Sequence, residues 1–372
     1  MLDILDPYNY PFWILIISIF SLVTYVIGRP FSTYVKFVYP NAKFEAIGNP
    51  FIGEQELDSI IDNKDVISFK ETINTLKDYN VQGEDIYSIQ KSLDNTFIEV
   101  IEMMKQDSSK NLNEFFNTYL EKFDIYLIKN ELKKIYTDRK SEIDIEKAIL
   151  PKTKEFLVKI KEADKNDLPK ILESFGFNKN LISILTDENV DLLTYDITLD
   201  KYILSRLSQV KVPYKCEEAK KGYINVLIDT INIKNILRAK QLGFDIDFCK
   251  NLFIGEGTEI AKWKFEELSE VEQVSQVVSA LEGTSYFEYL KDSIEEYNKE
   301  KSVQVFETAL DRNLLKLVKD ISVKNYTTLG PTIRFLISKE FEIKNLKIIV
   351  KGIYEKISSD VIKKLLVWEV GA

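Results

Sequence analysis

The side chains that usually carry catalysis are scarce in this sequence. Histidine is absent from all 372 residues, which removes the commonest general base and the commonest metal ligand. The two cysteines, Cys216 and Cys249, form no Cys-x-x-Cys arrangement, so the sequence supports neither a zinc site nor a disulfide. We interpret both as small core residues in a reducing cytoplasm.

One carboxylate-rich segment remains as a candidate for acid–base chemistry. Its members are Glu256, Glu259, Glu266 and Glu267. No spacing brings two of these carboxylates together for hydrolysis, and Lys262 and Lys264 stand among them, as on an ordinary solvated helix. The sequence therefore predicts no catalytic residue.

The segment Gly255-Glu256-Gly257 comes nearest to a phosphate-binding loop. It lacks both a third glycine and a Gly-Lys-Ser/Thr sequence, which a phosphate loop needs. We interpret it as a turn leading into a helix, where glycine supplies a positive φ. The sequence thus predicts no nucleotide, no other cofactor and no metal ion.

Composition indicates a helical globular protein of several units. Hydrophobic residues make up 45% and charged residues 29%, with 13 glycines and 9 prolines. A chain of 372 residues is long enough for two or three cores. The net charge of −9 arises from intermixed Lys and Glu, so no basic face is available for nucleic acid.

Helical periodicity runs through almost the whole chain after Pro30. Phe306, Leu310, Leu314, Leu317 and Ile321, for example, form one apolar stripe at helical spacing. No convincing stretch alternates as a β-strand would. The predicted fold class is therefore all-α.

The amino-terminal segment is apolar and differs from the rest. No charged residue lies between Pro7 and Gly28, and residues 12–28 would form a helix of ~25 Å, at the lower limit for crossing a bilayer. Asp3 and Asp6 precede the segment where a secretory signal would carry basic residues. The two interpretations are a membrane anchor formed by residues 12–28 and an extension buried in the protein.

Basic residues follow the apolar segment and predict its orientation. They are Arg29, Lys36 and Lys43. By the positive-inside rule, these residues keep the carboxy-terminal part of the chain at the cytoplasmic face of the cell membrane.

Internal repeats indicate related units. Phe51-Ile52-Gly53 recurs as Phe253-Ile254-Gly255, an offset of 253 − 51 = 202. A helix motif occurs three times, as Glu131-Leu132-Lys133-Lys134-Ile135, Asn232-Ile233-Lys234-Asn235-Ile236 and Glu342-Ile343-Lys344-Asn345-Leu346. The offsets are 232 − 131 = 101 and 342 − 232 = 110, near half of 202. A second frame aligns the Ile-Lys-Asn triplets at Ile128, Ile233 and Ile343; we favour the first.

The repeats predict three similar helical domains after the apolar extension of residues 1–30. The domains are residues 31–140, 141–249 and 250–372. Three such domains in series would form an arc or ring around a partner. In the first frame Lys134, Asn235 and Asn345 share one position, so we propose them as residues that contact a partner in the central opening. The alternative is that these polar residues lie on the solvated face while the aliphatic residues pack.

These residues resemble a known family. Tyr39 to Ala46 (YPNAKFEA), the Phe-Ile-Gly segments, Asn232 to Lys240 (NIKNILRAK) and above all Gly330 to Leu346 (GPTIRFLISKEFEIKNL) are similar to the C subunits of archaeal A-type ATP synthases, which are relatives of the d subunits of V-ATPases. The resemblance extends from about Phe31 to the carboxy terminus, and the extension before Phe31 lies outside the family's pattern.

The resemblance implies a three-domain helical funnel with a mechanical role. Such a protein caps the membrane proteolipid ring of the rotor, receives the central stalk subunits of D and F type, and thereby couples ion translocation to ATP synthesis without catalytic residues. A membrane-attached helical adaptor unrelated to ATP synthesis is the alternative function, and a histidine-free hydrolase is a more distant one.

Overall fold

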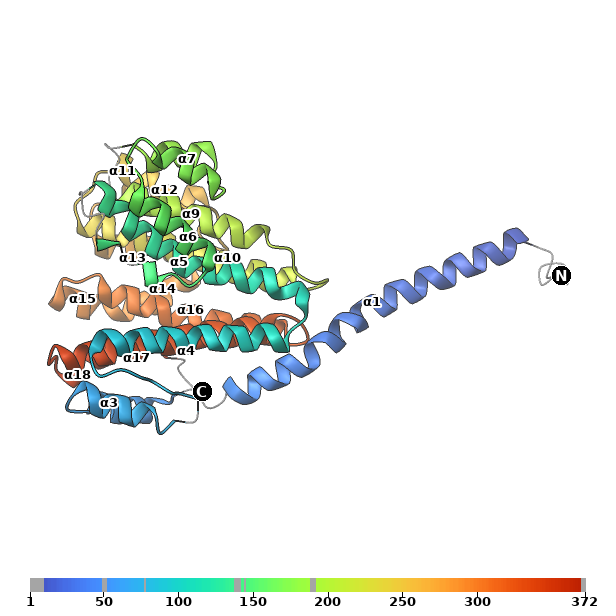
Figure 1. Cartoon of the computed structure of the whole chain (residues 1–372). Coiled ribbons are helices and arrows are strands. Elements are labelled where there is room, and N and C mark those ends of the chain that lie inside the picture. Colours follow the sequence, from blue (N-terminus) through green and yellow to red (C-terminus); the bar gives the residue numbers. More distant parts are fainter. Residues whose placement is uncertain are drawn as a thin grey trace.

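The protein is built from helices. The computed structural model describes residues 10–48, 52–76, 78–136, 142–143, 145–187 and 192–368 (Figure 1). Helices predominate, and these described residues contain no β-strand. The predicted all-α class is confirmed.

The α-helices follow one another with short connections. Their bounds are α1 Tyr10–Gly48, α2 Glu54–Ile61, α3 Val66–Ile73, α4 Ile86–Asp107, α5 Asn113–Tyr136, α6 Pro151–Glu162, α7 Leu168–Ser174, α8 Lys179–Leu185, α9 Leu192–Gln209, α10 Glu217–Gln241, α11 Ile246–Asn251, α12 Lys262–Glu270, α13 Val274–Ala280, α14 Ser285–Leu290, α15 Ile294–Glu300, α16 Gln304–Lys324, α17 Gly330–Tyr354 and α18 Ser359–Leu365. Short 3₁₀ turns lie at Lys110–Leu112, Ile145–Lys147 and Lys291–Ser293.

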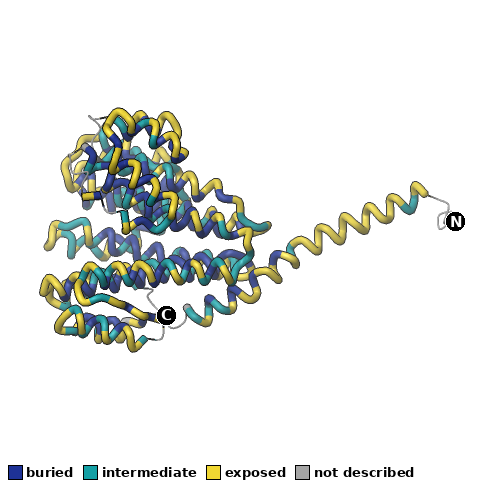
Figure 2. Tube along the Cα trace, in the orientation of Figure 1, coloured by how far each residue is buried: buried dark blue, intermediate teal, exposed yellow. Residues whose placement is uncertain are grey.

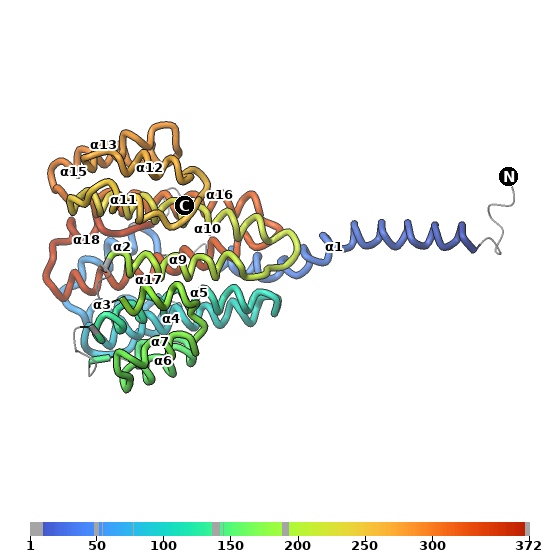
Figure 3. Tube along the Cα trace, turned by 90° about the horizontal axis from the view of Figure 1, so that it is seen from above, coloured from blue at the N-terminus to red at the C-terminus, as the bar shows by residue number. Residues whose placement is uncertain are grey.

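Long helices pack in three antiparallel pairs, which are α4 with α17, α5 with α9, and α10 with α16 (Figures 1 and 3). Helix α16 also packs along α17 and joins two of the pairs. The pair α4–α17 brings together the two ends of the chain.

Buried apolar residues form three clusters, the first of which contains residues from all three helix pairs. The first contains residues 37–120 and 314–367 together with part of 207–226, the second residues 125–203, and the third residue 197 with residues 233–310. These divisions do not coincide with the predicted domain boundaries after residues 140 and 249, because the first cluster draws on both chain ends. That three units superpose on one another stays a prediction.

Side chains of the repeated helix motif hold the repeated Phe-Ile-Gly segments. Asn232 accepts a hydrogen bond from the Ile254 amide at 3.0 Å and donates one to the Gly255 carbonyl at 2.9 Å. Glu342 accepts a hydrogen bond from the Ile52 amide at 3.2 Å. The first Phe-Ile-Gly copy is therefore held by α17 at the other end of the chain; its Phe51 lies outside the described residues.

Helix α1 continues through the predicted boundary at Pro30. It runs as one helix through Pro30 and Pro40 and projects from the body (Figure 1). Residues 14–29 are exposed on all sides, whereas Phe37 and Phe44 are buried (Figure 2). The interpretation of this segment as an extension buried in the protein is therefore wrong for residues 14–29. Of the helices that the structure describes, α1 is the one long and apolar enough to cross a membrane.

We predict that removing residues 1–30 leaves the helical body folded. Among residues 14–29, the contact with the body is the Arg29 guanidinium over the Tyr214 ring at 4.2 Å, and an exposed contact of this kind contributes ~0.5–1 kcal/mol. Thermal unfolding followed by circular dichroism should shift by no more than about 4 °C. Phe44→Ala in the full chain is the contrasting variant, because Phe44 is buried and stacks on Phe335, and its loss should cost ~3–5 kcal/mol. Loss of cooperative unfolding in the truncated chain would contradict the prediction.

Candidate functional site

A polar cavity of about 400 Å³ lies where helices from all three pairs meet. Helices α5, α9, α10, α16 and α17 line it. Its described charged side chains are the basic Lys122, Lys129, Lys133, Lys234, Arg238 and Lys344 and the acidic Asp196, Asp200, Asp311 and Glu340. The lining thus carries six basic and four acidic groups, an excess of two positive charges, in a chain whose net charge is −9.

Two pairs of helices use the same ion pair at the cavity. On α5 and α9, Lys129 lies 2.5 Å from Asp200, and on α10 and α16, Lys234 lies 2.6 Å from Asp311. The lysines are 234 − 129 = 105 positions apart and the aspartates 311 − 200 = 111. These two contacts are equivalent in position and in chemistry.

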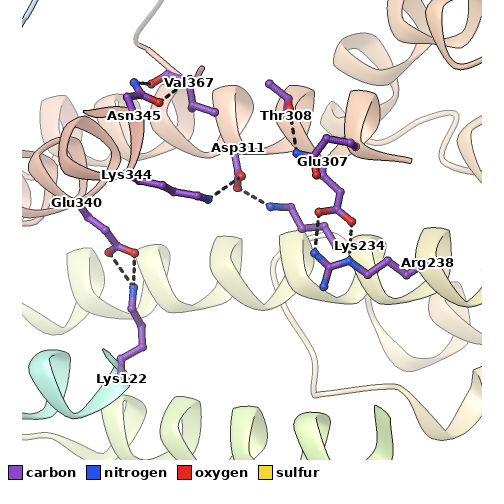
Figure 4. A network of polar contacts seen from close by, with 11 residues as sticks. Lys122, Lys234, Arg238, Glu307, Thr308, Asp311, Glu340, Lys344, Asn345 and Val367 are labelled. Carbon is purple, nitrogen blue, oxygen red and sulfur yellow. Dashed lines mark hydrogen bonds and ion pairs between the residues drawn. The ribbon is translucent and has the colours of Figure 1, made fainter. Parts of the chain in front are cut away.

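A second ion pair repeats at the same two offsets. Lys133 pairs with Asp196 at 2.8 Å, and the Arg238 guanidinium donates two hydrogen bonds to Glu307 at 2.5 and 2.6 Å (Figure 4). The basic residues are again 238 − 133 = 105 apart and the acidic ones 307 − 196 = 111. Repetition of both pairs indicates that α5 and α10 are related by 105 positions.

The offset of 105 positions is that of the second repeat frame, so this frame aligns residues that are equivalent in the structure. It aligns Ile128 with Ile233, so our preference for the frame with offset 101 was wrong. Each frame preserves apolar spacing, and only the ion-pair partners on the neighbouring helices distinguish them. The residue equivalent to Asn235 is therefore Asn130 instead of Lys134. Asn130 lines the cavity, and the triplet Ile128-Lys129-Asn130 was the signal for it.

The three residues proposed from the sequence lie in different environments. Asn235 lines the cavity, is 5% exposed, and its side-chain amide nitrogen has no hydrogen-bond partner among the described residues. Asn345 is buried away from the cavity, donating to the Val367 carbonyl at 2.6 Å and accepting from its amide at 3.0 Å (Figure 4). Lys134 donates to the Glu142 carbonyl at 2.7 Å near the end of α5. A partner contact remains our proposal for Asn235, since the other two side chains hold segments of this chain.

Helix α17 joins the charge network from the remaining side. The Lys344 ammonium lies 3.4 Å from Asp311, so one carboxylate receives lysines from α10 and α17 (Figure 4). Lys122 of α5 donates to both carboxylate oxygens of Glu340 on α17, at 2.9 and 2.8 Å. These contacts link α5, α10 and α17 around the cavity.

Burial shifts the titration of the groups in this network. Burial lowers the pKa of the Lys234 ammonium, and the nearby Asp311 opposes that shift. Burial raises the pKa of the Asp200 carboxyl, and Lys129 opposes the shift. Burial disfavours the charged form of both side chains, and the opposite charge beside each one stabilises it. The network therefore fixes helix positions and presents its remaining charge to the cavity.

The sequence candidates for chemistry have structural roles. A Cβ on Gly257 would lie 1.9 Å from an Asp229 carboxylate oxygen, and Asp229 accepts backbone hydrogen bonds from Thr258, Glu259 and Ile260 at 2.8 to 2.9 Å. The positive φ that we expected for this glycine is therefore wrong. Glycine is required at position 257 because the Asp229 carboxylate leaves no room for a side chain.

Three of the four candidate carboxylates have separate partners within this chain, and the fourth, Glu256, is exposed. Glu259 accepts hydrogen bonds from Ser285, Glu266 pairs with Lys262 at 3.8 Å, and Glu267 pairs with Lys264 at 2.9 Å. Within the described ranges no group of three or more Cys, Asp and Glu residues is arranged to hold a metal ion. The predicted burial of Cys216 and Cys249 is confirmed.

Comparison with known proteins gives one consistent result. The sequence model of the family described as ATP synthase (C/AC39) subunit matches residues 40–365. The A-type ATP synthase C subunit of Methanosphaera stadtmanae is 31% identical over 349 residues, covering 91% of this chain and 90% of the relative. The corresponding protein of Methanothermobacter thermautotrophicus is 29% identical, covering 89% and 88%. That of Pyrococcus horikoshii is 27% identical, covering 94% and 95%.

Proposed function

Because this chain belongs to the ATP synthase (C/AC39) subunit family, we propose that it is a non-catalytic rotor part joining the central stalk to the membrane proteolipid ring. In this role it transmits torque, so that ion translocation drives ATP synthesis. A part that turns with both neighbours needs broad, shape-matched contacts, and permanent interfaces of this kind bury ~2,000 Å² or more. Its partners are the stalk subunits of D and F type and the ring.

The polar cavity between α5, α10 and α17 is the observation that carries this proposal. Helices from all three pairs line it, and the lining has an excess of two positive charges. Asn235 offers a buried donor without a partner among the described residues. A stalk tip that presents carboxylates and backbone carbonyls would satisfy both features, and packed contacts around the polar groups would supply most of the binding energy.

The membrane ring, the second partner in this proposal, meets the end of the body from which α1 projects. Helices α5, α10 and α17 all begin at this end (Figure 3). The turns before them, residues 108–112, 210–216 and 325–329, contain exposed Lys110, Lys211 and Lys215 and no acidic residue. Such turns suit the polar loops and head groups at the cytoplasmic face of the cell membrane. The apolar part of α1 then anchors the protein in the bilayer.

A pull-down from native membranes with mass spectrometry tests the proposal. Ring and stalk subunits should both co-purify with the tagged chain. Lys344→Glu should lower recovery of the stalk subunits about tenfold, equivalent to ~1.4 kcal/mol, because Lys344 is half-exposed beside the cavity and the change places a second anion near Asp311. Recovery of the ring protein should remain unchanged.

Lys299→Glu on α15 is the matched control. Lys299 is exposed, pairs with Glu295 within its own helix, and does not line the cavity. It carries the same charge reversal and should leave recovery of both partners unchanged. Recovery of neither ring nor stalk by the unaltered chain would contradict the proposal and favour the adaptor function.

A further inference from the structure

We propose that the exposed apolar part of α1 enters the central opening of the membrane ring and turns there with the rotor. This inference rests on the proposed function and adds to it the position of α1. Three properties of the helix support it: where it leaves the body, what its surface requires, and what rotation permits.

Residues from two different helix pairs contact α1 near the point where it leaves the body. Lys43 lies 2.5 Å from Asp107, which ends α4 just before the turn to α5. The Arg29 guanidinium lies over the ring of Tyr214, in the loop between α9 and α10, at 4.2 Å. Helix α1 is therefore in contact with the last residue of α4 and with the turn before α10 at this end of the body.

The third turn holds α1 most firmly. The side-chain amide of Asn41 donates to the carbonyls of Tyr326 and Thr328, between α16 and α17, both at 2.8 Å. Because the end of α4 and the turns before α10 and α17 all contact α1, the helix leaves the body across the end at which α5, α10 and α17 begin, with its base beside α17 and α4 (Figure 1). A body seated over a ring directs such a helix toward the opening of the ring.

The surface of α1 requires apolar surroundings on every side. No charged residue lies from Tyr10 to Gly28, and residues 14–28 are exposed all round (Figure 2). A helix that docks on one protein surface keeps a polar face toward water, which this segment lacks. Residues 10–28 span about 28 Å as a helix, close to the hydrocarbon thickness of ~30 Å.

Rotation then favours the centre of the ring over its outside. A membrane helix fixed to the rotor moves through the bilayer with every turn, and outside the ring it would meet the stationary membrane components of the complex. Near the axis it moves with its surroundings. A single helix with side chains needs an opening of about 10–12 Å, and the lipid or inner helix faces of the ring supply the apolar contact.

Site-specific photo-crosslinking in the intact complex tests the position of α1. The photoreactive residue p-benzoylphenylalanine replaces Phe20, which is 70% exposed in the apolar segment. The matched control replaces Tyr354, which is 54% exposed at the end of α17 away from α1. The complex is isolated through a tag on the ring protein, irradiated, and its adducts are identified by mass spectrometry.

The expected result is an adduct with the ring protein from position 20 as its main protein adduct, and none from position 354. An adduct from position 20 with a stationary membrane component, or no ring adduct at all, overturns the inference while the proposed function stands. Absence of this chain from the complex isolated through the ring refutes the proposed function itself. The two failures are therefore distinguished by one preparation.

Discussion

An ATP synthase complex reconstituted without this chain is expected to hydrolyse ATP at the full rate of its soluble head while moving no ions across the membrane. If the protein is the rotor contact between stalk and ring, its removal leaves the nucleotide sites intact but interrupts the transmission of torque. ATP-driven ion uptake into vesicles should fall to the level of passive leak, and ATP synthesis driven by an ion gradient should fall with it.

Adding back the protein provides the control. The full chain should restore ion uptake to the level of the complete complex in proportion to its binding. A chain lacking residues 1–30, which we expect to fold, shows whether α1 contributes to seating on the ring or whether the helical body alone restores coupling. Ion uptake and ATP synthesis that persist at full rate in the complex without this chain would refute the coupling function.

A large loss of stability is also expected from a single substitution in the charge network, at Asp311. This carboxylate receives Lys234 at 2.6 Å and Lys344 at 3.4 Å, and the Lys234 side chain is 14% exposed. Asp311→Ala leaves the Lys234 ammonium without its main anion in a buried position, which typically costs ~3–5 kcal/mol. Chemical denaturation at pH 7 should show a loss of stability in this range.

The pH dependence of this loss identifies its cause. Burial lowers the pKa of Lys234 in the folded protein, and removal of Asp311 lowers it further. A lysine whose pKa is lower in the folded than in the unfolded state binds its proton more weakly in the folded state. It therefore destabilises the folded protein at pH values below the unfolded-state pKa of ~10.4, and this effect disappears above that pKa. The difference in stability between the variant and the unaltered protein should therefore shrink between pH 7 and pH 10.

Asp94→Ala provides the matched control for Asp311→Ala. Asp94 pairs with Lys347 at 2.7 Å, but both side chains are substantially exposed. Surface pairs of this kind contribute ~0–1 kcal/mol, and the difference from the unaltered protein should not vary with pH in this range. If Asp311→Ala and Asp94→Ala lowered the free energy of unfolding equally, burial of the Lys234–Asp311 pair would not be the cause of the loss.

Local patterns in the sequence predicted the helices well. The apolar stripe of Phe306, Leu310 and Leu314 became the buried face of α16, because helical periodicity reflects which side chains can leave water together. The apolar extension also proved helical. Its helix continues past the predicted domain boundary at residue 30 to Gly48, with Pro30 and Pro40 inside it.

The candidate site depended on contacts that sequence spacing cannot supply. Helical spacing alone allowed both repeat frames. The partners Asp200 and Asp311, on separate helices, identified the frame that replaces Lys134 with Asn130. Asn345 carries the same side chain as Asn235, yet one holds Val367 and the other faces the cavity. Which polar residue meets a partner is decided by the neighbouring elements.

By itself, the sequence determined the helical class, the apolar amino-terminal helix, the recurrence of one helix motif and the resemblance to a family of ATP synthase subunits. All four follow from residues close together in the chain, whose side chains obey local spacing. The tertiary structure alone decided that α17 pairs with α4, that Glu342 holds the segment at Ile52, and that charges from three helix pairs surround one cavity. The first two contacts join elements from opposite ends of the chain, and they form because burying apolar faces brings both chain ends into one core.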